Sequence, residues 1–490
     1  MQAGHFPTDN LRHGPYHPLG PMGVILAKSG EALEDLVKEA AVAIHSSSGL
    51  SGKVEEAAAK DDEKREEKRK DSGGAGALRR KPGLSPIPGA SGGLVTTPWT
   101  VLHALARSLT LTRKGAARGL SEHWGGLKYG LDLSPDSAKA RGHMVLSSDS
   151  QSMASAYYKR LRSDELGTGF GIVLAEHILR ERYPGHMVSL IPADTALQAG
   201  WALSASDERH RKGRGSLPSR QQRLSCFFEV WKPGEPSRVF PVDFRGNHGT
   251  PARVHRQLAD SSARVEAVHI GPWNRTPCMV FGTVLDTDRP ITVYGLESPG
   301  SGRLLGPPSE NLDRGVESRH EFPGINRPAP RGGPVENVPG FHIKPENGEW
   351  FQRVLAHTAV AGLAAFTGDG EAASGYLTEG QGKKYFSAYA HSATGSIRNV
   401  HGEEFFGLPF TGTDHVFRLG DKRLDAFSGV PEYLFDLVEG KKVEQYRREV
   451  HARMAEWSEK PVIWDERWGG PVSRHPDGSV LAIRPLHRST

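Results

Sequence analysis

A carboxylate and a guanidinium stand two residues apart at the end of a predicted strand near the middle of the chain. The stretch SCFFEVWKPGEPSRVFPVDFRGNHGT, residues 225–250, contains two runs of β-forming residues joined by the turn KPGEPS, which predicts a hairpin. Because successive side chains of a strand alternate between its faces, Asp243 and Arg245 are expected on one face. Arginine holds phosphate in a forked geometry but does not accept a proton near neutral pH. The pair therefore predicts a phosphate contact or an ion pair at the strand end.

The residues that follow this strand, GNHG, suggest a second way of contacting phosphate. They resemble the Gly-Asn-His turn of metallophosphoesterases, but Gly249 stands where those enzymes have an acidic residue, and no Asp-x-His strand precedes the turn. That family is therefore not favoured. Asn247 and His248 are expected either to face a phosphate or simply to form the turn into a helix that Thr250 caps and Pro251 begins.

A basic loop precedes the hairpin. The segment DERHRKGRGSLPSRQQR contains Gly, Ser and six positive side chains, which is the composition of a loop that grips a phosphate backbone and also of an ordinary solvated loop. The candidate nucleic-acid contacts in it are Arg209, Arg211, Lys212, Arg214, Arg220 and Arg223.

The elements that must position these residues are predicted over residues 167–298. A helix (167–185) is followed by an apolar strand (186–193), the two hairpin strands, a second helix (250–270) and two further strands near 278–285 and 291–298. This order predicts an α/β sandwich with a mixed sheet. The glycines of GTGFG, at the start of the first helix, are expected either to bind an anion there or to allow close packing on the sheet.

This order resembles the restriction-endonuclease-like fold, the PD-(D/E)xK nuclease superfamily. In that family a helix with an acidic residue precedes a hairpin that carries one acid and then an acid-x-Lys, and a second helix follows. The resemblance covers about residues 167–298, and the segment RQLADSSARVEAVHIG resembles proteins of this class from actinobacteria. It implies a restriction-endonuclease-like mixed-sheet core with flanking helical segments.

The resemblance also implies a chemistry, in which two carboxylates hold Mg²⁺ beside the scissile phosphate and a lysine orients the attacking water. Carried over to this chain, Asp243 is the second acid, and the lysine is replaced by Arg245. The first strand acid falls near Ser225, so Glu229 is the candidate that completes a metal pair with Asp243, and Glu176 is the candidate helix carboxylate. If the chain is active, its cofactor is Mg²⁺; if not, these residues are a remnant.

The rest of the chain is predicted to divide at changes of composition. Residues 21–45 predict an amphipathic helix, and the charge-dense and then Pro/Gly-rich stretch after it predicts a disordered linker. A Thr-Pro start and helical spacing predict a helix near 97–109. The predicted segments are an N-terminal helical one (1–45), the linker (46–95), a helical one (96–166), the nuclease-like domain (167–300), a Pro/Gly-rich linker (301–345) and a C-terminal α+β domain (346–490).

Composition narrows the class of protein. The 490 residues are 37% hydrophobic and 24% charged with a net charge of +5, which predicts globular domains and places any polyanion binding on a local patch. Cys226 and Cys278 lie in apolar runs and are expected to be buried thiols, as in a reducing cytoplasm. No apolar run reaches membrane-spanning length.

The sequence therefore favours a cytoplasmic protein that binds nucleic acid, DNA in the first place, through a degenerate restriction-endonuclease-like core. Two alternatives stay open. The first is an active Mg²⁺-dependent nuclease with a variant site, and the second is a non-catalytic scaffold that binds a protein partner through its C-terminal domain. Convergence of Glu176, Glu229 and Asp243 in one cleft would favour chemistry, whereas a filled face would favour the scaffold.

Overall fold

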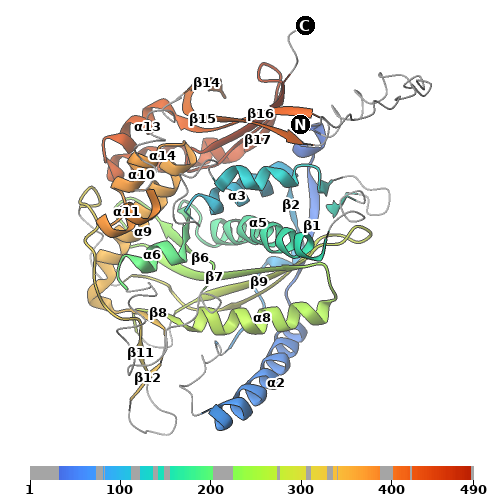
Figure 1. Ribbon diagram of the computed structural model, residues 1–490, viewed down its shortest axis with the longest axis vertical. Helices are drawn as coiled ribbons and strands as arrows, with labels where there is room; N and C mark the ends of the chain where they lie inside the picture. Colours follow the sequence, from blue (N-terminus) through green and yellow to red (C-terminus); the bar gives the residue numbers. More distant parts are fainter. Residues whose placement is uncertain are drawn as a thin grey trace, which may run out of the picture.

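A mixed seven-stranded sheet lies at the centre of the molecule (Figure 1). The structure is a computed structural model, and it describes residues 33–72, 81, 83–111, 122–135, 142–147, 155–201, 224–272, 276–304, 311–327, 335–338, 340–386, 401–419 and 422–486. The strand order is β2-β1-β10-β9-β7-β6-β5. The strands are β1 (Ala40–His45), β2 (Leu94–Thr96), β5 (Met187–Pro192), β6 (Cys226–Trp231), β7 (Arg238–Asn247), β9 (Cys278–Val284) and β10 (Thr292–Ser298).

Two helices cover opposite faces of this sheet. Figure 1 shows α5 (Ala156–Arg182) on one face and α8 (Pro251–Glu266) on the other. The strands β5, β6 and β7 are antiparallel neighbours, and β9 lies parallel to β7 after the α8 crossover. The predicted hairpin of β6 and β7 and the predicted α/β class with a mixed sheet are thereby confirmed. Cys226 and Cys278 are buried in the sheet, as expected.

The first helix begins earlier than predicted, because α5 starts at Ala156 rather than near residue 167. The GTGFG glycines consequently lie inside a helix, and the predicted anion site at a helix start is wrong. Their role is close packing, of Gly167 and Gly171 on β7 and of Gly169 on α3. A Cβ on Gly171 would lie 2.2 Å from the Phe244 ring, and one on Gly246 would lie 1.8 Å from the carbonyl oxygen of Ser163.

The region predicted as a disordered linker contains a long helix, α2 (Ser48–Ser72). Leu50, Val54 and Ala58 are buried at a spacing of four residues and form a narrow apolar stripe. This stripe packs with the core of α8, and Figure 1 shows α2 beyond α8, on the side away from the sheet. The sequence prediction missed it because the stripe includes an alanine and stands among many charges.

The predicted N-terminal helix over 21–45 is also corrected, as far as the structure describes it. Residues 1–32 lie outside the described part, a short 3-10 helix η1 spans Asp35–Val37, and Ala40–His45 form the strand β1. This strand pairs in parallel with β10 and antiparallel with β2, so the N-terminal region belongs to the central sheet. Pairing with distant strands therefore outweighed local helix preference.

The helix predicted behind a Thr-Pro start is confirmed as α3 (Pro98–Leu109). The hydroxyl of Thr97 caps it by accepting a hydrogen bond from the backbone N–H of Thr100 at 3.1 Å. Figure 1 shows α3 between α5 and the C-terminal sheet, and the indole N–H of Trp99 donates to the carbonyl oxygen of Leu481 at 3.0 Å. Around it lie η2 (Ala90–Gly92), η3 (Glu122–Tyr129), β3 (Leu133–Ser134) and β4 (Val145–Leu146).

The C-terminal part contains both helices and a second sheet. Its strands form a six-stranded sheet in the order β14-β15-β16-β19-β18-β17. The strands are β14 (His401–Phe405), β15 (Leu408–Leu419), β16 (Lys422–Pro431), β17 (Val462–Asp465), β18 (Gly470–Arg474) and β19 (Val480–Pro485). The helices are α9 (Gly348–Phe366), α10 (Gly370–Gly375), α11 (Glu379–Phe386), α13 (Glu432–Glu439) and α14 (Val443–Glu459).

The stretch predicted as a second linker contributes to the folded structure. Its strand β13 (Phe341–Ile343) pairs in parallel with β8 (Val268–Ile270), directly after α8. The remaining elements are α6 (Ala193–Gln198), β11 (Ile325–Arg327), β12 (Glu336–Val338) and η6 (Pro345–Asn347). None of the helices in the described ranges is long and apolar enough to cross a lipid bilayer.

Candidate functional site

Asp243 is completely buried on β7, with its side chain directed toward α8. One carboxylate oxygen accepts a hydrogen bond from the hydroxyl of Ser225 at 2.8 Å, and the other accepts one from the hydroxyl of Ser261 at 2.6 Å. The guanidinium groups of Arg245 and Arg264 lie 3.2 Å and 3.3 Å from the second oxygen. Both oxygens are thus engaged, and the negative charge is balanced by two arginines.

Glu229 lies on the same face of the sheet as Asp243 but well away from it. In the β6–β7 register Glu229 stands opposite Val239, four residues from Asp243, which is about 13 Å along a strand. Its carboxylate is fully buried and is held by Arg447 of α14 at 2.9 Å and by the hydroxyl of Ser237 at 2.5 Å. The predicted metal pair of Asp243 and Glu229 is therefore not assembled.

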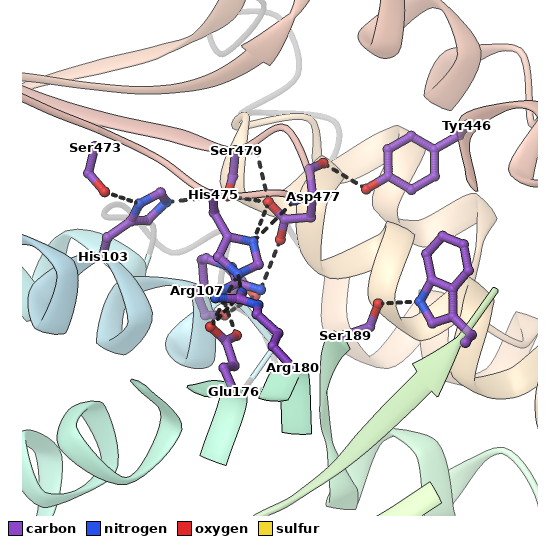
Figure 2. Close-up of polar contacts among 12 residues, drawn as sticks. His103, Arg107, Glu176, Arg180, Ser189, Tyr446, Ser473, His475, Asp477 and Ser479 are labelled. Atoms are coloured by element: carbon purple, nitrogen blue, oxygen red, sulfur yellow. Dashed lines mark hydrogen bonds and ion pairs between the residues drawn. The ribbon is translucent and has the colours of Figure 1, made fainter. Parts of the chain in front are cut away.

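Glu176 lies on the opposite side of the sheet, on α5, and faces the C-terminal part instead of the hairpin. It pairs with Arg107 and Arg180, both at 3.1 Å, and with His475 at 3.2 Å (Figure 2). Burial acts to raise the pKa of Glu176, but these positive neighbours, His475 first, outweigh it and hold the pKa well below its usual range. Glu176 consequently stays ionised and belongs to a different cluster.

The three predicted carboxylates therefore do not converge, and they do not fit a Mg²⁺ ion. In the part of the chain that the structure describes, no three His, Cys, Asp or Glu side chains gather in a way that could hold a metal ion. Each predicted ligand has arginine partners, which compete with a cation for the same oxygens.

The residues around Glu176 form a buried polar network that the sequence analysis missed. The turn between β18 and β19 brings His475 and Asp477 against α3 and α5 (Figure 2). The Nδ1 atom of His475 lies 3.0 Å from Asp477, and Arg107 lies 2.9 Å from the same carboxylate. Five residues, which we call the hairpin network after the β18–β19 hairpin, make up this cluster: Arg107, Glu176, Arg180, His475 and Asp477. Its groups are all paired with one another, so it joins the C-terminal sheet to the core.

The charges of three arginines from three elements act on Asp164, at the place where α5 and the carboxyl end of β7 touch through Ser163 and Gly246. The arginines are Arg160 of α5, Arg245 of β7 and Arg253 of α8, and we call them the arginine cluster. Burial raises the pKa of Asp164, while the positive charges of these arginines act in the opposite direction. Arg160 and Arg253 are exposed and Arg245 is partly exposed, so positive groups face solvent here.

His248 joins the turn after β7 to the start of α5. Its Nε2 atom is 3.0 Å from the carbonyl oxygen of Lys159. Burial, followed by the charge of Arg162, lowers the pKa of His248, so the imidazole is neutral at neutral pH. His248 is thus a neutral, half-buried ring, and its contact with a phosphate stays a prediction. Thr250 holds the N-cap position of α8, but its hydroxyl makes no capping bond.

A groove of about 250 Å³ lies beside the arginine cluster, on the α5 side of the sheet. Part of its wall is apolar and comes from α3, α5, β5 and β7, namely Leu105, Leu109, Ile172, Leu190 and Phe244. The polar part is made by Ser108, Asp164, Glu165, Thr168 and Ser225. Asp164 thus belongs to the groove and also stands at the centre of the arginine cluster.

The predicted basic loop cannot be placed, because its positive residues lie outside the described part of the chain. The loop leaves the described structure after Trp201 and rejoins it at Leu224, one residue before Ser225 of the groove. The residues concerned are Arg209, Arg211, Lys212, Arg214, Arg220 and Arg223.

The sequence analysis missed Asp164, Arg160 and Arg253. The first two were overlooked because α5 was predicted to begin after them. Asp164 precedes Glu176 by twelve residues on α5, or about 18 Å of helix, so only Asp164 reaches the strand end. Comparison with protein-family models, curated proteins and solved structures finds no match for this chain.

Proposed function

We propose that this chain binds nucleic acid through the arginine cluster and does not cut it. The described core supports the proposal by its order of elements. The helix α5, the antiparallel strands β5, β6 and β7, the helix α8 and the parallel strand β9 follow one another as in the restriction-endonuclease-like fold. Likeness of fold alone does not fix function, whereas the charged side chains at the end of β7 bear on it directly.

The convergence of the three arginines carries the proposal. Asp164 is the acidic group on which all three act. Of the other carboxylates nearby, Glu165 is paired with Lys128, and Asp243 is paired with Arg245 and Arg264. Positive charge is therefore in excess, and guanidinium groups from three elements can contact successive phosphates. Because such contacts go to the backbone, we expect affinity without strong sequence preference.

The surroundings of Asp243 favour binding without cleavage. A nuclease of this type needs two carboxylates whose oxygens are open to a metal ion, and a group that handles the proton of the attacking water. Here the oxygens of Asp243 are engaged by two serines and two arginines, and Ser225 supplies a hydroxyl in place of the second carboxylate. Arg245 remains protonated and cannot act as a base.

The test is a binding titration against labelled duplex and single-stranded DNA, with and without Mg²⁺, at several salt concentrations. The double variant Arg160→Ala/Arg253→Ala should weaken binding at low salt. It should also reduce the steepness of the plot of log binding constant against log salt concentration by about 2, since each lost phosphate contact lowers this slope by about 1. The matched control is Arg467→Ala, whose side chain is 75% exposed in the turn between β17 and β18.

Three results would count against the proposal. Absence of binding by the wild type would refute it outright. Equal affinities and slopes for the wild type and the double variant would remove the arginine cluster from the interface. Mg²⁺-dependent cutting by the wild type, lost in Asp243→Asn, would show that the chain is a working nuclease.

A further inference from the structure

We infer that the site takes an unpaired nucleotide, with its phosphate on the arginine cluster and its base in the adjoining groove. The ligand class is therefore single-stranded nucleic acid, or a duplex with an unpaired base. This inference rests on the proposed function and adds to it the state of the strand that is bound.

The size and lining of the groove suit a nucleobase. Its volume of about 250 Å³ is below the roughly 300–1,000 Å³ of pockets for drug-sized ligands, so it fits a smaller, compact group. Leu109 and Leu190, which are partly exposed, offer apolar surface to the faces of a ring, and Ser108 and Thr168 offer hydroxyls to its edge. Leu190 is half-buried, so apolar surface is exposed inside the groove.

Asp164 links the two parts of the site. In the described structure its carboxylate forms neither a hydrogen bond nor a close ion pair, although it lies near three arginines. Its oxygens can therefore accept a hydrogen bond from the exocyclic amino group of a base, as acidic side chains do with cytosine. A phosphate attached to the same nucleotide would replace Asp164 as the partner of the arginines.

A base within a regular duplex cannot enter this groove. Its faces are stacked on neighbouring bases and its edge is paired, so it must leave the stack before it contacts Leu190 or Asp164. A single strand presents its bases without this cost. We therefore expect the phosphate contacts to hold either form and the groove to hold only unpaired nucleotides, which favours the single strand.

The experiment compares the affinity of the full chain for a short labelled single strand and for the duplex of the same sequence. The wild type should bind the single strand about tenfold more tightly or better, because a duplex must first unstack and unpair the base that enters the groove. Leu190→Trp, which places an indole in the groove, should remove most of this preference and leave duplex affinity unchanged. Val416→Trp is the control, since Val416 is 42% exposed on β15.

Thr168→Phe, on the opposite wall, replaces Leu190→Trp if the latter fails to fold, as judged by thermal unfolding. An independent readout is a duplex with one unpaired nucleotide, which should bind more tightly than the fully paired duplex. Equal affinity for all these forms, unchanged by filling the groove, overturns this inference and leaves the proposed function standing. Absence of binding to any of them overturns the proposed function as well.

Discussion

The exchange Asp243→Asn distinguishes a structural carboxylate from a metal ligand by the sign of its effect on stability. The substitution keeps the shape of the side chain and removes its charge. One amide oxygen can still accept a hydrogen bond from a serine, but the new NH₂ group faces the donors of Arg245 and Arg264. Two guanidinium groups then share a largely buried space without the counter-charge that Asp243 supplied.

The magnitude follows from the burial of the partners. Breaking a buried ion pair by removing one member costs about 3–5 kcal/mol. Asp243 is fully buried, but the side chains of Arg245 and Arg264 are 27% and 17% exposed and can turn toward water. We therefore expect a loss of about 2–3 kcal/mol in the free energy of unfolding, at or just below the lower end of that range.

The assay is urea-induced unfolding at neutral pH, followed by circular dichroism. The control is Asp414→Asn, because Asp414 is exposed on β15 and its exchange should change the unfolding free energy by less than about 0.5 kcal/mol. A carboxylate retained for metal binding strains its surroundings, and its removal commonly leaves stability unchanged or raises it. A loss below about 1 kcal/mol, or a gain, would therefore refute the structural role of Asp243.

Three further predictions concern stability. Arg447→Ala, which leaves a fully buried carboxylate on β6 without its cation, should cost about 3–5 kcal/mol in urea unfolding, whereas Arg448→Ala at the exposed neighbouring position should cost little. Burial lowers the pKa of His123 to about 3, so the contribution of the neutral ring to the free energy of unfolding is present above about pH 6.5 and is lost as the pH falls toward 3. The carboxylates of the hairpin network, Glu176 and Asp477, also have lowered pKa values, and their contribution to the free energy of unfolding is lost as the pH falls below about 4.5. The unfolding midpoint should therefore fall between about pH 6.5 and pH 3 because of His123, and again below about pH 4.5 because of the carboxylates. His123→Asn should flatten the fall that begins at about pH 6.5. Gly246→Ala should cost about 1–3 kcal/mol or more, because its Cβ has no room, whereas Gly52→Ala, in open space on α2, should be neutral or stabilising by thermal unfolding.

Local signals in the sequence were enough to predict the centre of the fold. The turn KPGEPS between two β-forming runs located the β6–β7 hairpin, and alternation placed Asp243 and Arg245 on the same side, where they form an ion pair at 3.2 Å. A Thr-Pro start located α3. In each case the residues that decide the structure lie within a few positions of one another in the chain.

The candidate site could not be predicted in the same way, because its partners come from distant parts of the sequence. Glu229 is paired with Arg447, more than two hundred residues later, and Glu176 with His475, almost three hundred residues later. Periodicity carries no information about such pairs. The resemblance also directed attention to Glu176, although Asp164 is the carboxylate of α5 that reaches the arginine cluster.

The parallel pairing of β1 with β10 has a consequence for how the chain is made. The partner of β1 is completed about 250 residues after β1 itself. At a synthesis rate of about 5–20 residues per second, β1 waits roughly 12–50 seconds on the ribosome before β10 exists. During that time β1 and β2 have only each other, and a two-stranded pair is marginal in water. The N-terminal edge of the sheet is therefore exposed to wrong pairing while the chain is being made.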